Sequence, residues 1–198
     1  MRTNTRRTFA GLALLITLGV AGSANAELRS TRGPFYIQGA LPALNVWGGS
    51  GLAGCGGRFG GCSSGGWRPD VEFGIHFTGR HDGFVLAFRQ AFIVTAPSGD
   101  PGGATVVKLG YDIPIQIKKY ELDIGPYGTF GVGYDFGGGG RIGVQAGFVG
   151  VDVKFFIVKG FYAFARPFEF GMQCFHDFGG RCGFQYAMGL GVGYAFPN

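Results

Sequence analysis

Runs of strictly alternating residues dominate the sequence and limit the folds open to it. Every second residue of 107–117 is Val, Leu, Tyr or Ile, and every second residue of 184–196 is a large apolar one. A period of two is typical of β-strands, because successive side chains point to opposite faces. Glycine makes up 41 of the 198 residues, and each glycine costs a helix interior about 1 kcal/mol relative to alanine. The sequence therefore predicts an all-β fold.

Eight alternating runs follow one another along the chain. They cover about residues 34–47, 67–79, 84–94, 104–117, 121–136, 141–156, 161–174 and 182–196. Short connections near 80–83, 118–120 and 157–160 alternate with longer ones near 48–66, 95–103 and 175–181, although 137–140 is four glycines. This order predicts an eight-stranded antiparallel up-and-down β-barrel formed by residues 27–198. The alternation shifts phase near Gly150 and at Arg166-Pro167, where we expect bulges.

The two faces of each run differ in a way that indicates which one lies inside. A lipocalin-like soluble barrel would bury its apolar face and cover its outside with charges. Here the second face is mostly Gly, Ala, Gln and Thr with occasional charges, which suits a crowded lumen better than a soluble exterior. A belt of Phe, Tyr, Ile, Leu and Val suits contact with lipid. We therefore expect a transmembrane barrel with its apolar face outward.

Because every second residue of a run faces inward, the alternation then places a set of ionisable side chains in the lumen. These are Glu72, His76, Arg89, Lys108, Asp112, Asp123, Asp135 and Glu169. A turn at 80–83 would put Arg89 opposite Gly74 and diagonal to Glu72 and His76. Because unpaired buried charges cost several kcal/mol, the set predicts an internal salt-bridge network that plugs the barrel. The alternative is a narrow polar path for ions or small solutes, with the many inward glycines leaving room for water.

Residues 1–26 have the pattern of an export signal. A basic start precedes the apolar stretch Ala10–Val20, which is too short to span a membrane, and small residues end at Ala26. We expect cleavage after Ala26, which lowers the net charge from +5 to about +2 and leaves no reason to expect nucleic-acid binding. The Arg6-Arg7 pair leaves both the general and the twin-arginine export routes open.

The four cysteines fit the oxidising compartment that such a signal implies. Four cysteines allow three pairings, and closeness in sequence favours Cys55 with Cys62 and Cys174 with Cys182. We expect two loop disulfides. The spacings contain no C-x-x-C element, so no metal site is expected, and nothing in the sequence indicates a cofactor.

Candidates for catalysis are weak, and we expect no catalytic residues. His76 and Thr78 share a face of one run, with Thr78 expected to point inward, and His176-Asp177 lies in the last long connection. Ser63 and Ser64 lie in the first long connection, with no evident base. A lipid A-modifying hydrolase or acyl transferase, which would need a histidine near a hydroxyl and an acid, is kept as a second alternative.

The signal, the eight runs and the alternating aromatics at the end of the last one resemble the small outer-membrane barrels of Gram-negative bacteria, of the OmpA, OmpX and OmpW type. The resemblance implies a structural or surface-exposed protein in the outer membrane, among lipid and lipopolysaccharide. It places the N-terminus in the periplasm and both disulfides at the external rim. It also implies that Tyr194 and Phe196 are read by the assembly machinery, although Pro197 and Asn198 follow them.

Overall fold

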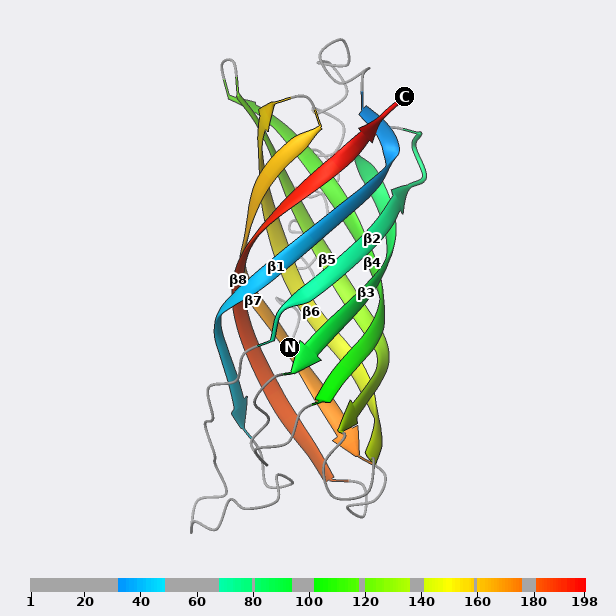
Figure 1. The fold of residues 1–198 in the computed structure, drawn as a ribbon, viewed down its shortest axis with the longest axis vertical. Coiled ribbons are helices and arrows are strands. Elements are labelled where there is room, and N and C mark those ends of the chain that lie inside the picture. Colours follow the sequence, from blue (N-terminus) through cyan, green and yellow to red (C-terminus); the bar gives the residue numbers. More distant parts are fainter. Residues whose placement is uncertain are drawn as a thin grey trace, which may run out of the picture.

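The computed structural model describes residues 32–48, 68–79, 81–93, 102–117, 120–135, 141–158, 160–175 and 181–198. Its eight strands are β1 (Arg32–Gly48), β2 (Asp70–His76), β3 (Gly83–Ile93), β4 (Gly102–Ile117), β5 (Tyr120–Asp135), β6 (Arg141–Val158), β7 (Phe161–Phe175) and β8 (Arg181–Pro197). Each strand pairs antiparallel with the next, and β1 pairs with β8, so the sheet closes into a barrel of oblique strands (Figure 1). The predicted fold is confirmed. The described part of the chain holds no helix long and apolar enough to cross a membrane.

The strand boundaries follow the alternating runs, with β2 as the exception. The predicted strand 67–79 shortens to Asp70–His76, because the chain turns from Phe77 onward. The Thr78 hydroxyl donates to the Asp82 carbonyl at 2.6 Å, and Gly79 adopts a φ of 73°, in the left-handed region that glycine enters without strain.

The same turn corrects the predicted β2–β3 register. Phe77 N–H donates to the Phe84 carbonyl at 2.9 Å, which centres the turn one residue earlier than expected. Arg89 therefore lies directly opposite Glu72 rather than opposite Gly74. A directly opposite pair of unlike charges is closer than a diagonal one, so the correction brings these two side chains into contact.

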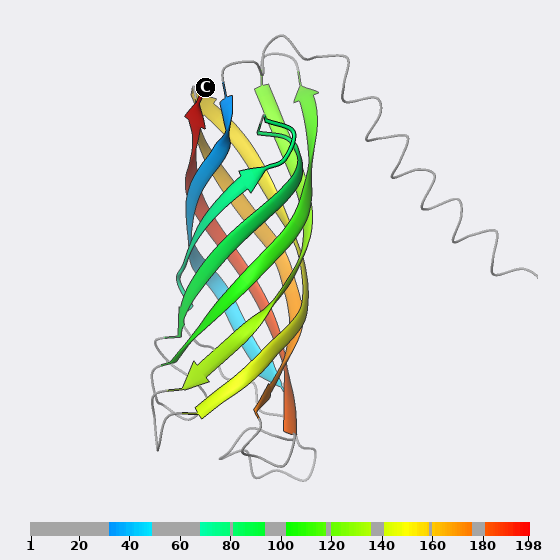
Figure 2. The same ribbon diagram turned by 90° about the vertical axis from the view of Figure 1, so that its right-hand side faces the viewer.

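The two ends of the barrel differ, as the connection lengths predict. The β2–β3 turn and the end of β8 lie at one end, uppermost in Figure 2, and antiparallel pairing brings the β4–β5 and β6–β7 connections to it. We name it the short-turn end. The expected irregularities are also confirmed, since the β6–β7 register shifts on both sides of Gly150 and the β7–β8 register shifts between Arg166 and Glu169.

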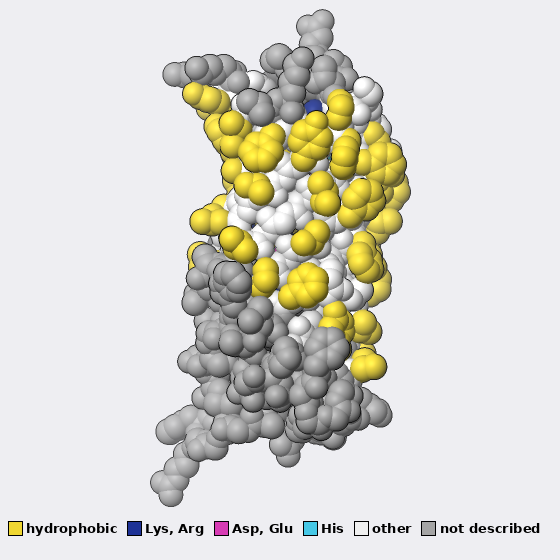
Figure 3. All heavy atoms as spheres, in the orientation of Figure 1, with side chains coloured by type: hydrophobic (Ala, Val, Ile, Leu, Met, Phe, Trp, Pro, Cys, Tyr) yellow, Lys and Arg dark blue, Asp and Glu magenta, His cyan; other side chains and the backbone are white. Residues whose placement is uncertain are grey.

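Apolar side chains face out of the barrel and charged ones face in. Phe84 is 65% exposed and Leu190 is 62% exposed, whereas Glu72 and Arg89 are fully buried. Figure 3 shows hydrophobic side chains spread over the described part of one face, with hardly any charge between them. The expected orientation is confirmed, and it is the reverse of a lipocalin-like soluble barrel.

The inward glycines make room for tyrosine rings rather than for water. Gly74, Gly150 and Gly193 lie directly opposite Tyr36, Tyr127 and Tyr162, respectively, on the neighbouring strands. A Cβ built on any of these glycines would collide with the opposite ring. The expectation that inward glycines leave a wet path is therefore wrong at these three positions, because each ring covers its glycine.

The Tyr–Gly pairs predict that one methyl group added to such a glycine destabilises the barrel. Gly74→Ala should destabilise the barrel by about 1–3 kcal/mol, because the Tyr36 ring must move and its hydroxyl donates to Glu72 at 2.6 Å. Gly39→Ala is the matched control in a neighbouring strand, because its added Cβ would lie 3.6 Å from the nearest neighbour. Urea unfolding in detergent measures both variants, and equal losses would contradict the steric role.

The register places Cys174 of β7 directly opposite Cys182 of β8. The disulfide between them stays a prediction, and Cys55 and Cys62 lie outside the described residues. Because Arg181 separates the two cysteines in sequence, trypsin cuts between them. We expect mass spectrometry of an unreduced digest to find the two peptides linked and a reduced digest to find them separate. Separate peptides in both digests would refute this pairing.

Candidate functional site

The barrel interior brings together almost all of the predicted polar residues. Seven of them are at most 2% exposed, namely Glu72, His76, Arg89, Lys108, Asp112, Asp123 and Glu169. The eighth, Asp135, ends β5, and its side chain lies outside the described part. The interior charges form two groups at different heights, which we describe in turn.

The first group, the central cluster, contains four cations and four carboxylates. Its members are Arg68, Asp70, Glu72, Arg89, Lys108, Asp152, Arg166 and Glu169. Arg89 bridges Glu72, at 2.8 Å from its Nε, and Glu169, through its Nη1. Lys108 Nζ lies 2.8 Å from Glu72 and 2.7 Å from Asp152. The charges balance within the cluster, as burial requires.

These contacts cross the barrel rather than following its wall. Arg89 lies on β3 and Glu169 on β7, four strands apart in a closed ring of eight. Lys108 of β4 reaches Asp152 of β6. Neutral groups on β1 and β5 extend the cluster further around the barrel. Gln38 of β1 donates to Glu72 at 3.0 Å, and the Tyr127 hydroxyl of β5 donates to Glu169 at 2.7 Å.

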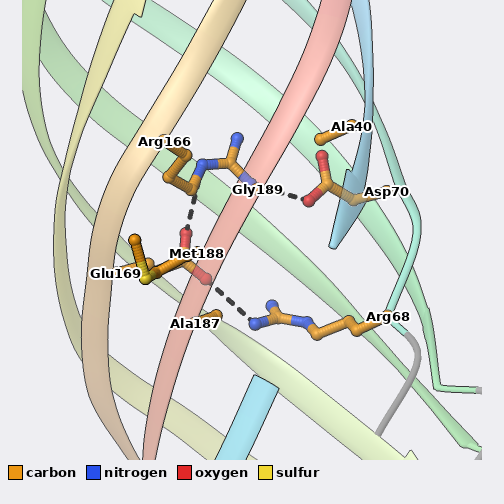
Figure 4. A pocket seen from close by; sticks show the side chains of 8 residues that line it. All are labelled: Ala40, Arg68, Asp70, Arg166, Glu169, Ala187, Met188 and Gly189. Atoms are coloured by element: carbon orange, nitrogen blue, oxygen red, sulfur yellow. Dashed lines mark hydrogen bonds and ion pairs between the residues drawn. The ribbon is translucent and has the colours of Figure 1, made fainter. Parts of the chain in front are cut away.

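A small hollow opens beside the central cluster (Figure 4). Arg166 and Arg68 converge on Glu169 there, and Arg166 Nη1 donates to Asp70 at 2.7 Å. The small side chains of Ala40 and Ala187 form part of its lining. The ion pairs therefore form the polar wall of the hollow.

The second group, the short-turn cluster, lies nearer the short-turn end. It consists of Arg32, His76, His81, Asp112, Glu121, Asp123 and Lys154. His76 Nε2 lies 2.8 Å from Asp112 Oδ2, which also accepts from Lys154 Nζ. The Arg32 guanidinium donates to both Glu121 oxygens at 2.7 and 2.8 Å, a bidentate geometry that fixes both side chains.

His81 enters the barrel end from the β2–β3 turn and is 4% exposed. Its ring packs against His76, Tyr36, Phe156 and Tyr162, with centroid separations of 4.2 to 5.6 Å. Burial, reinforced by the positive charge of Lys154, lowers the pKa of His81 well below its ordinary value. The ring is therefore neutral, and one of its nitrogens carries a free lone pair.

Several interior residues were not among the predicted ones. Asp152 and Lys154 of β6 and Arg166 of β7 are 0–4% exposed, and they lie on the two strands where the alternation shifts phase. The order Val151, Asp152, Val153, Lys154 is strictly alternating, so the alternation of this short stretch could have predicted that Asp152 and Lys154 face inward. His81 lies in a predicted turn, where the alternation does not indicate whether a side chain faces inward or outward.

The weak catalytic candidates gain no support where the structure describes them. Thr78 is exposed rather than inward, and its hydroxyl donates to Asp82, while the nearest acid to His76 is Asp112. The turn that begins at Phe77 rotates Thr78 away from the His76 face. His176, Asp177, Ser63 and Ser64 lie outside the described residues.

The central cluster predicts a large cost for removing one of its cations. Arg89→Met should destabilise the barrel by about 3–5 kcal/mol, because it leaves four buried carboxylates against three cations in the cluster. The double variant Arg89→Met/Glu72→Gln restores the charge balance and should recover part of that loss. Urea unfolding of both variants in detergent measures the free energy of unfolding. A loss under about 1 kcal/mol for Arg89→Met, which is the range of exposed ion pairs, would contradict the network.

Comparison with known proteins identifies the fold and no more than the fold. No protein-family model matches the sequence, and a search of curated proteins finds no match. Among solved structures, the chain is similar to the crystal structure of Neisserial surface protein A (NspA), with a TM-score of 0.51 and 14% sequence identity over 82% of this chain and 97% of that one. At this identity the match shows the fold alone, and the chain shares the closed eight-stranded barrel fold with NspA.

Proposed function

We propose that this protein is an integral outer-membrane β-barrel with a structural or surface-exposed role, whose lumen is closed by its own side chains. The observation that carries the proposal is the combination of an apolar exterior with a charged, ion-paired interior. The apolar exterior is not sufficient alone, because a barrel with an aqueous pore has an apolar exterior as well.

The exterior supports residence in a membrane. Side chains such as Phe130, Ile142 and Val144 are 56–68% exposed, and exposed apolar area on this scale is unstable in water. Seven of the strands span 11 to 18 residues, whereas about 9–11 residues suffice to cross a bilayer at the usual tilt. Closure pairs the backbone of every strand on both sides, which hydrocarbon requires.

The interior supports a closed lumen. Arg89 and Lys108 each join strands that are not neighbours, and Tyr36, Tyr127 and Tyr162 fill the space above the inward glycines. An eight-stranded barrel is only just wide enough for side chains to meet inside. Ion pairs across the axis at that width leave little room for a hydrated ion.

The position of the aromatic pair on β8 supports assembly by the outer-membrane machinery. Tyr194 and Phe196 are 38% and 41% exposed near the short-turn end, and their rings meet edge to face at 5.5 Å. Both rings therefore face outward, where a partner can reach them. In this proposal the short-turn end faces the periplasm and the long connections face outward, among lipopolysaccharide.

Conductance in planar bilayers separates this proposal from a narrow channel. The wild-type protein should give no steady current, and Arg89→Ala/Lys108→Ala should raise the current, because it removes both crossing cations. Gly39→Ala serves as a control that leaves the interior unchanged. Steady wild-type current that Arg89→Ala alters would overturn the closed lumen and favour the channel.

Membrane residence itself is tested by fractionation of the expressing bacterium. The protein should co-purify with outer membranes and migrate faster in electrophoresis before heating than after it, because the closed barrel resists detergent. Recovery in a soluble fraction would contradict the assignment even if the lumen is closed.

A further inference from the structure

We propose that the short-turn cluster is a binding site for one divalent transition-metal ion of the zinc type, held by His76, His81 and Asp112. Each residue offers one ligand atom, and these atoms all lie within 4.8 Å of one another. Two imidazoles and one carboxylate form a donor set that zinc and its neighbours in the first transition row accept. The inference does not depend on the proposed membrane role.

His81 is the first observation that points to a missing ligand. Both of its ring nitrogens are buried and neither has a hydrogen-bond partner in the described structure. A buried polar atom left unsatisfied costs about 1–3 kcal/mol, and the two tyrosine hydroxyls of the cage donate to Glu72 and Gln38 rather than to His81. A metal ion bound to one nitrogen would remove this cost for that atom.

His76 is the second ligand of the proposed site, and its two ring nitrogens already have neighbours that suit one. Its Nδ1 lies 3.3 Å from the Pro34 carbonyl, a group that can only accept a hydrogen bond. Its Nε2 lies 2.8 Å from Asp112 Oδ2, so a metal ion bound to both atoms would replace the hydrogen bond between them while Nδ1 donates to the carbonyl. Metal-bound histidines usually have this arrangement, with the second ring nitrogen donating to a carbonyl or carboxylate.

Small movements would complete the coordination. A tetrahedral ion about 2.0–2.1 Å from each ligand atom needs those atoms roughly 3.3 Å apart, so the widest separation must close by about 1.5 Å. His81 lies in a turn, between Gly79 and Gly83, so the turn rather than a paired strand would have to adjust. Lys154 contacts Asp112 and lies opposite Asp123 in the β5–β6 register, so its ammonium has a second carboxylate beside it.

Co²⁺ is the probe, because its visible absorption reports tetrahedral coordination. The full protein, purified from membranes in detergent, is stripped with chelator, refolded with Co²⁺ and titrated. We expect one Co²⁺ per chain, displaced by Zn²⁺. His81→Phe keeps an aromatic ring in the cage but loses both nitrogens, and it should weaken Co²⁺ binding at least tenfold. Asp112→Asn, which keeps the shape of the side chain, should weaken it as well.

His176→Phe is the matched control, since it removes the third histidine of the chain and should leave Co²⁺ binding unchanged. Heat-dependent electrophoretic mobility verifies that each variant has folded. A folded wild-type barrel that takes up no Co²⁺ would overturn the proposal. Equal binding by wild type and a folded His81→Phe would overturn it as well.

Discussion

The interior charges are the constraint on which the rest of the structure depends. Buried cations and carboxylates cross a barrel whose outside carries Phe, Leu and Val, so no outward route to water exists through the wall. Each ion must therefore find its partner inside, at hydrogen-bond distance, or cost several kcal/mol. The closed register, the Tyr–Gly pairs and the β2–β3 turn all serve to set those partners in place.

The two clusters satisfy this constraint differently. In the central cluster every carboxylate contacts a cation, and Arg89, Lys108 and Arg166 each contact more than one carboxylate. That arrangement balances the charges of the cluster without a further ion, and it supports a mechanical role. The short-turn cluster brings two imidazoles and a carboxylate within 4.8 Å of one another, and both ring nitrogens of His81 lack a partner, so it is the part of the interior in which we propose a bound cation.

The alternation of the sequence was sufficient to predict the barrel, its orientation and seven buried polar residues, because a period of two fixes the face of each side chain without knowledge of its neighbours. The β2–β3 register failed because it depends on a turn, where Thr78 and Gly79 decide the geometry locally. Asp152, Lys154 and Arg166 were missed on β6 and β7, where the register shifts on both sides of Gly150 and between Arg166 and Glu169, because a shift exchanges the inward and outward positions that follow it. His81 was missed because alternation assigns no face to a turn residue, and it is the shape of the β2–β3 turn, beside the neighbouring β4, that brings it against His76 and Asp112.

The crossing of ion pairs from β3 to β7 and from β4 to β6 has a consequence for how the chain enters a bilayer. Charges that meet only across the axis stay unmatched while any one hairpin is alone, and an unmatched charge in hydrocarbon is costly. Arg89 keeps Glu72 within the β2–β3 hairpin, but a stepwise insertion of hairpins would leave Lys108 of β4 apart from both Glu72 of β2 and Asp152 of β6. Full neutralisation of the interior therefore needs the other strands in place, so that partly inserted forms are disfavoured and the barrel enters as one cooperative unit.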